Sequence, residues 1–274
     1  MNTTFESTRR ITCARFAHCT VGIFMLVGVW ILGSPFPSTA DETDAELRET
    51  GRLLAILLDS GRVTIGRNQA LLNDPAKGDK GFTTEVFAAQ VMAVFQERTG
   101  HDLADLSHAK VPGMAKPLLQ ELLAESKRTV ASYQPVLNMQ GLVYKGLIPA
   151  TFGTETGARF QKSSGIYLKQ TAPEHLLRNP KNKPDVFEVT QMTKMNDPAQ
   201  VHNGDAIVSE TVEEGKSVRV LLPLFYEKAC LSCHGQPKGE RDITGYPREG
   251  AKEGELGGVI SVKIDRNRSG APPF

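Results

Sequence analysis

Two cysteines spaced two residues apart and followed directly by a histidine constrain this chain more than any other feature: Cys230-Leu231-Ser232-Cys233-His234. The pattern C-x-x-C-H is the attachment signature of a c-type haem. In that chemistry the two thiols add to neighbouring vinyl groups of the ring, and the histidine supplies an imidazole nitrogen to the iron. The sequence therefore predicts one covalent haem c, bound through Cys230 and Cys233, with His234 as an axial ligand of the haem iron.

Three other uses of a cysteine pair fit the sequence less well. A disulfide would close a very small ring, and close pairs of this kind are usually redox-active rather than stabilising. A thioredoxin-like site belongs at a strand-to-helix turn of a βαβ unit, whereas this pair follows a predicted strand in a Gly- and Pro-rich surrounding. A zinc site would need a fourth ligand, and the sequence has no second C-x-x-C pair.

The N-terminus has the composition of an export signal. Residues 1–20 are basic, residues 21–33 form a short apolar run, and Ser38 and Ala40 fit the −3 and −1 positions of a cleavage site. We predict a cleaved signal peptide over residues 1–40 and a periplasmic location, where covalent haem attachment takes place. The alternative is an uncleaved membrane anchor, but the apolar run is shorter than the roughly 20 residues that a spanning helix needs.

The first part of the mature chain, residues 41–112, is predicted to be a helical region. Leucines recur near one face of residues 43–60, and Gly61 is expected to end that helix. Further helices are expected within residues 62–73, from Thr83 or Thr84 to Gly100, and from about Met114 to Tyr133.

After Gly165 the sequence changes to short apolar or alternating runs between Pro, Gly and Asn clusters, which is typical of antiparallel strands. Helices followed by strands indicate an α+β fold. We place the domain that carries the cysteine pair at residues 113–265 and a flexible Pro- and Gly-rich tail at residues 266–274. The predicted strands are residues 166–169, 186–191, 205–212, 217–225 and 257–264.

Two segments that lie 65 residues apart resemble each other. Residues 80–103 and 145–168 match at eight of 24 positions. A solenoid needs at least about three repeats. We therefore interpret the match as two amphipathic helices that are capped alike.

Three sequence blocks together resemble a known family. The first is Leu177–Glu188, LRNPKNKPDVFE; the second joins Leu222-Pro223-Leu224 to the cysteine motif and Gly235; the third runs from Gly245-Tyr246 to Val262. The chain is similar here, over about residues 115–265, to the PAS-like periplasmic c-type haem-binding domain family. The members of that family are sensor modules of signalling proteins or small stand-alone cytochromes.

This resemblance implies a PAS-like antiparallel sheet with N-terminal and flanking helices, and a haem held against the sheet. It carries over Cys230, Cys233 and His234 as the haem-binding residues. The sequence departs from the family at one point. Some members supply a distal cysteine ligand from the helix before the R-N-P block, but residues 146–152 contain no cysteine.

The sixth iron ligand is left open by the sequence. A second histidine or a methionine would set different redox potentials, and an open position would suit ligand binding. Arg178, Lys181 and Lys183 are candidates for ion pairs with the haem propionates, and Phe187, Phe225 and Tyr226 for packing on the ring or in the sheet core. Asn179 and Asn182 are expected to fix a turn. The candidate sixth ligands are His101, His108, His175, His202, Met139, Met192 and Met195.

The two functional hypotheses are a monohaem cytochrome that carries single electrons in the periplasm, and a haem-based redox or gas sensor. The expected partner is accordingly a redox protein or a membrane signalling protein, with membrane contact only if the leader stays uncleaved. A formal net charge of +1 does not indicate a nucleic-acid binder. No distal acid-base pair stands out, so we do not expect an enzyme.

Overall fold

The structure is a computed structural model that describes residues 42–196 and 207–266. The predicted signal peptide, His202 and nearly all of the predicted tail lie outside the described residues. The described helices and strands are α1 (Asp44–Arg67), α2 (Gln69–Leu72), α3 (Thr84–Thr99), α4 (Ala115–Leu137), α5 (Pro149–Ser164), β1 (Tyr167–Thr171), α6 (Val186–Met195), β2 (Val208–Val212), β3 (Ser217–Phe225), α7 (Leu231–His234) and β4 (Leu256–Asp265), with short 3-10 helices η1 (Glu174–Leu176), η2 (Pro180–Asn182), η3 (Glu213–Gly215) and η4 (Lys228–Cys230).

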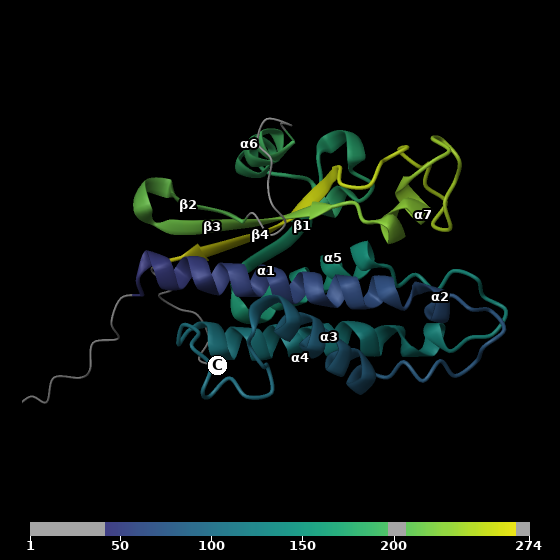
Figure 1. Ribbon diagram of the computed structural model, residues 1–274, viewed down its shortest axis with the longest axis horizontal. Coiled ribbons are helices and arrows are strands. Elements are labelled where there is room, and N and C mark those ends of the chain that lie inside the picture. The colour runs from purple at the N-terminus through teal and green to yellow at the C-terminus, as the bar shows by residue number, and fades with distance from the viewer. Residues whose placement is uncertain (1–41, 197–206, 267–274) are drawn as a thin grey trace, which may run out of the picture. The chain divides into compact units, whose positions relative to one another are not determined.

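The four strands form one antiparallel sheet in the order β1-β4-β3-β2, which confirms the predicted α+β fold. Successive side chains of a strand point to opposite faces, and both faces of this sheet are covered (Figure 1). On one face, Val218, Val220 and Leu222 of β3 join the main core with α1. On the other face, Leu221 of β3 and Val259 of β4 belong to a second cluster under α6.

Helix α1 begins with a capping box in which Thr43 and Glu46 satisfy each other's backbone N–H groups. The prediction that Gly61 ends this helix is wrong, because α1 continues to Arg67. Gly61 instead allows a close approach. A Cβ atom there would lie 2.4 Å from Cε1 of the Phe152 ring. None of the helices among the described residues is long and apolar enough to cross a membrane.

The predicted strand over residues 186–191 is also wrong, because these residues form most of α6. Asp185 and Glu188 make a second capping box, which starts a helix where the alternating pattern suggested a strand. Glu188 is fully buried, and Arg219 of β3 and Lys169 of β1 pair with its carboxylate. The capping box and these ion pairs together fix α6 on the sheet.

The predicted likeness of two capped helices is confirmed at their C-terminal ends, whereas at the N-terminal ends only α3 has a side-chain cap, from Thr83. Helices α3 and α5 end at Gly100 and Gly165, both in the left-handed conformation with φ of 75° and 73°. The similarity extends further than the two helices, however. The side chain of Asn138 accepts a hydrogen bond from the backbone N–H of Lys80, and that of Asn73 accepts one from Lys145, at 3.1 Å each.

A second pair of hydrogen bonds has the same reciprocal form. Gln134 donates to the carbonyl of Phe82 at 2.8 Å, and Gln69, 65 positions before Gln134, donates to the carbonyl of Leu147 at 2.9 Å. Reciprocal contacts of this kind define a two-fold relation, in which residue i contacts j′ and residue j contacts i′. The helical part is therefore built from two related halves, residues 44–100 and 109–165.

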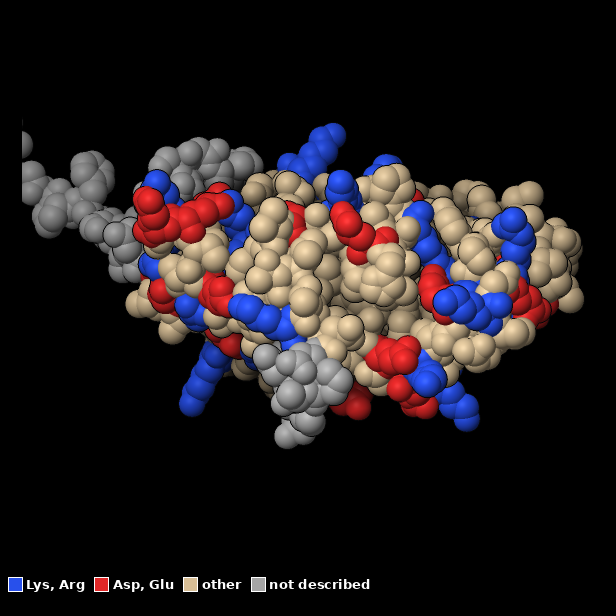
Figure 2. All heavy atoms as spheres, turned by 90° about the horizontal axis from the view of Figure 1, so that it is seen from above, with Lys and Arg blue, Asp and Glu red and all other residues tan. Residues whose placement is uncertain are grey.

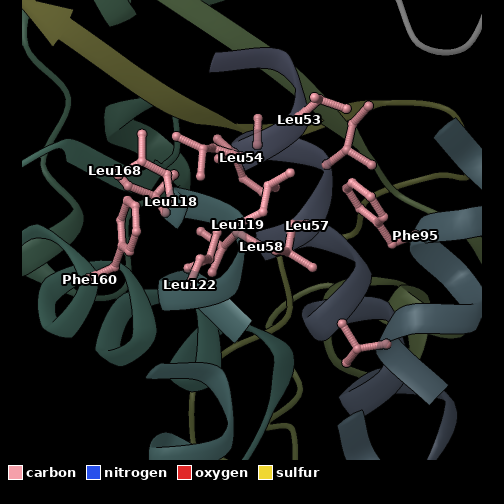
Figure 3. Close-up of a cluster of buried hydrophobic side chains, with 14 of the residues drawn as sticks. Leu53, Leu54, Leu57, Leu58, Phe95, Leu118, Leu119, Leu122, Phe160 and Leu168 are labelled. Atoms are coloured by element: carbon pink, nitrogen blue, oxygen red, sulfur yellow. The ribbon is translucent and has the colours of Figure 1, made fainter. Parts of the chain in front are cut away.

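Equivalent leucines and phenylalanines of the two halves fill the centre of the helical part (Figure 3). Phe87 and Phe152, again 65 positions apart, meet edge to face with ring centroids 5.4 Å apart. Fully buried pairs in the figure are Leu53 and Leu118, Leu54 and Leu119, Leu57 and Leu122, and Phe95 and Phe160.

Two glycines of α1 provide a matched test of this packing. Alanine in place of a helical glycine gains about 0.5–1 kcal/mol of helix propensity. Gly66→Ala should gain that amount, since its Cβ would lie 3.5 Å from Pro149. Gly61→Ala should instead destabilise by about 1–3 kcal/mol, because its Cβ would overlap the Phe152 ring. Urea unfolding of both variants measures the difference, and equal stabilisation by the two would contradict the packing.

Candidate functional site

The C-x-x-C-H motif lies just beyond the end of β3. The strand ends at Phe225, and the motif then curls through η4 and α7. The backbone N–H of Cys230 donates to the carbonyl of Glu227 at 2.8 Å, and that of Gly235 donates to Leu231 at 2.9 Å. The carbonyl of His234 accepts from two backbone N–H groups of the segment that returns to β4. Both ends of the motif are thus held by backbone hydrogen bonds.

Both cysteines are free thiols and are partly exposed. Burial raises the pKa of the Cys233 thiol, and a hydrogen bond from Ser232 opposes that shift. Among the described residues, no cluster of three or more His, Cys, Asp or Glu side chains is arranged to hold a metal ion.

The His234 imidazole is held from two sides. Its Nδ1 lies 2.9 Å from Oε2 of Glu249, and the ring of Tyr226 packs against it with centroids 4.9 Å apart. The hydrogen bonds found among the described residues all use Nδ1 and leave Nε2 available. Burial lowers the pKa of His234, and the positive charge of Arg178 lowers it further, against the opposing effect of Glu249. The ring is therefore disposed to be neutral, the form that binds a metal.

Arg178 connects the R-N-P block to the motif. Its Nε and Nη2 bond both oxygens of Glu249 at 2.7 and 3.0 Å, and Nη1 bonds Asp242 at 2.6 Å. Nη2 also donates to the carbonyl of Cys233 at 3.0 Å. A planar guanidinium forms such forked bonds, which a lysine cannot reproduce. Arg178 thus fixes the motif backbone and, through Glu249, the His234 ring.

Hydrogen bonds favour the ionised form of the two carboxylates around Arg178 by lowering the pKa of each. Burial alone would raise the pKa of Asp242, but hydrogen bonds from Thr244 and Arg178 outweigh it and lower the pKa. Burial likewise opposes the lowered pKa of Glu249, which hydrogen bonds from Arg178 and His234 produce. The Asp242 side chain is fully buried and so depends on Arg178 as its charge partner.

Other residues expected at the site have different surroundings. All three side-chain nitrogens of Arg178 bond oxygens of the chain, so a contact between Arg178 and a haem propionate stays a prediction. Lys181 and Lys183 are exposed, and their contacts with a propionate also stay predictions. Asn179 does fix a turn by accepting from the backbone of Lys181, whereas the buried Asn182 bonds the Thr154 side chain.

The three aromatic candidates lie in two different parts of the structure. Tyr226 packs on His234, while Phe187 and Phe225 pack against the cluster under α6. Among the candidate sixth ligands, Met192 and Met195 are buried in that same cluster. His108 pairs with Asp105, and His175 is exposed in η1. His101 follows α3, and Met139 is half exposed.

Sequence reasoning missed the roles of Glu249 and Asp242. Glu249 was part of a recognised block, but only folding brings it within 2.9 Å of His234. Nothing in the local pattern around Asp242 indicates that it pairs with an arginine 64 positions earlier.

Removing the Arg178 guanidinium should destabilise the segment that holds the motif. Arg178→Met leaves the buried Asp242 carboxylate without its charge partner, which should cost about 3–5 kcal/mol. Arg241→Met is the matched control, since exposed Arg241 bonds only a backbone carbonyl, and should change stability by less than about 0.5 kcal/mol. Urea unfolding of the haem-free protein measures both, and similar losses in the two variants would refute the role of Arg178.

The crystal structure of the cyanobacterial heme-protein Tll0287 matches with 18% sequence identity and a TM-score of 0.38, covering 56% of this chain and 93% of that chain. A match of that level carries no argument about function. No curated protein matches the chain.

A family model described as Tll0287-like matches residues 41–265. The match includes the helical region before residue 113 as well as the segment that carries the cysteine motif. Because it covers most of the sequence, the chain belongs to the Tll0287-like family.

Proposed function

We propose that this chain is a haem protein that binds one c-type haem covalently through Cys230 and Cys233, with His234 as an axial ligand. One observation carries the proposal. Two free, partly exposed thiols and an imidazole with Nε2 available lie on the consecutive short helices η4 and α7. That is the donor set, in the spacing that covalent haem attachment uses.

The residues around the motif fit this cofactor chemically. Histidines that ligate metals almost always donate their other ring N–H to a carboxylate, carbonyl or water, which fixes the tautomer and makes the ligating nitrogen more basic. Glu249 accepts from Nδ1 in this way, and Arg178 holds Glu249 through both oxygens. Tyr226 restricts rotation of the imidazole by packing on it.

We further propose that the protein is an exported electron carrier of the periplasm. A bound haem would supply reversible one-electron exchange. The chain's own residues would hold the ligand orientation constant through Glu249, Arg178 and Tyr226, which limits structural change on electron transfer. The export part of this proposal depends on the N-terminal signal in residues 1–40, and the expected partner is a redox protein.

Covalent attachment should require both thiols and not the side chain of Ser232, one of the two residues between them. After expression with cytochrome maturation machinery, wild-type protein should keep its haem stain on a denaturing gel. Cys230→Ala with Cys233→Ala should lose all of it. Ser232→Ala, the matched control, should keep it, because this side chain bonds only to the neighbouring backbone and Cys233. Persistent stain in the double variant would rule out attachment at this motif.

Carbon monoxide separates the carrier from the alternative, a haem-based sensor that acts through a partner protein. A carrier with two axial ligands should show an unchanged spectrum of the reduced protein under carbon monoxide. A shifted spectrum would reveal an open sixth position and would favour sensing over electron transfer.

A further inference from the structure

Exposed apolar side chains concentrate in two loops of the described structure. Eight large apolar side chains are exposed among the described residues, and five of them lie in two short segments. We call these segments, residues 139–144 and 242–246, the paired apolar loops. Their exposed members are Met139 at 52%, Leu142 at 39%, Val143 at 56%, Ile243 at 42% and Tyr246 at 45%. Exposed apolar groups gathered in this way mark binding surfaces more often than isolated ones do.

Groups of both loops interact with groups at the cysteine motif. Burial raises the pKa of the Tyr144 phenol, and electrostatic interactions with Asp242, Cys233 and Tyr246 raise it further. In the second loop, Tyr246 donates to the carbonyl of Arg178 at 3.1 Å and its ring lies 5.5 Å from the Arg178 guanidinium, which in turn bonds the carbonyl of Cys233. The second loop is therefore linked to Cys233 through Arg178, and Tyr144 of the first loop interacts electrostatically with the same group of residues.

The two-fold relation of the helical part supplies an internal comparison. Residues 139–144 correspond to residues 74–79 in the first half, where the sequence is Asp-Pro-Ala-Lys-Gly-Asp instead of Met-Gln-Gly-Leu-Val-Tyr. The framework around the two loops is the same. Lys80 and Lys145 are both buried, and each donates its ammonium to an equivalent carbonyl, that of Asp74 and that of Met139.

One framework thus carries a polar loop in one half and an apolar loop in the other. The fold itself does not require apolar residues here, because the first half folds with lysine, glycine and aspartate at these positions. Apolar side chains left in water lose the stabilisation that burial would provide, roughly 25 cal/mol for each Å². The difference between the halves points to a ligand that covers the second loop only.

We propose that the paired apolar loops form the wall on which the haem attached at Cys230 and Cys233 packs, and that this wall keeps water from the ring. The inference rests on the proposed function and deepens it. The occupant is an apolar porphyrin face rather than a protein, because the second loop is linked through Arg178 to Cys233, where the haem would be attached. On the face of the molecule in Figure 2, Lys and Arg side chains are interspersed with Asp and Glu.

The test replaces exposed apolar residues with serine at two places. Leu142→Ser with Val143→Ser alters the proposed wall. Val186→Ser with Val189→Ser is the matched control, since these α6 side chains are also exposed, at 85% and 41%. Both variants remove only exposed apolar groups and should fold. Haem content per protein and the midpoint potential, measured by spectroelectrochemical titration, are the readouts.

The wall variant should keep its covalent haem and show a lower midpoint potential, because water at the ring stabilises the more highly charged oxidised iron. We expect its equilibrium constant for reduction to fall by roughly a factor of ten, which is about 59 mV for one electron. The α6 variant should match wild type. If haem is attached in every variant and all of them have the same midpoint potential, the proposal that the paired apolar loops cover the haem is wrong, and the proposed function is unaffected. Wild-type protein without haem would overturn both.

Discussion

The organisation of the site depends on one fork of hydrogen bonds, from Arg178 to Glu249, Asp242 and the carbonyl of Cys233. These groups come from segments that are distant in the sequence, and only Asp242 is fully buried. The fork joins the R-N-P block to the cysteine motif and orients the carboxylate that holds His234. Without it, the donor atoms would remain in the sequence but would lose their common support.

The second constraint is the shared plan of the helical halves. Asparagine, glutamine, lysine and glycine residues recur at a spacing of 65 positions and make the same contacts in reverse. The residues that make these contacts are the same in both halves, whereas the loop before α5 is apolar and its counterpart in the first half is polar. Because the polar loop folds on the same framework, the fold does not require the second loop to be apolar, whereas a bound apolar group would.

The cysteine motif, the α+β fold and all four strands of the sheet could be predicted from the sequence, because local patterns determine them. The strand expected at residues 186–191 failed because the Asp185–Glu188 capping box outweighs an alternating apolar pattern. Gly61 was misjudged because its role is contact with Phe152, 91 positions later, which local composition does not encode. Glu249 and Asp242 were missed for the same reason, since their partners are defined only by the tertiary fold.

The central claim is that the two thiols and His234 hold one covalent haem, and the mass of the intact protein tests it most directly. Protein expressed with cytochrome maturation machinery should have the mass of its polypeptide plus one haem, and proteolysis should place the added mass on the peptide that contains Cys230 and Cys233. A mass equal to the polypeptide alone, or lower by the two hydrogens lost in a disulfide, would contradict the account.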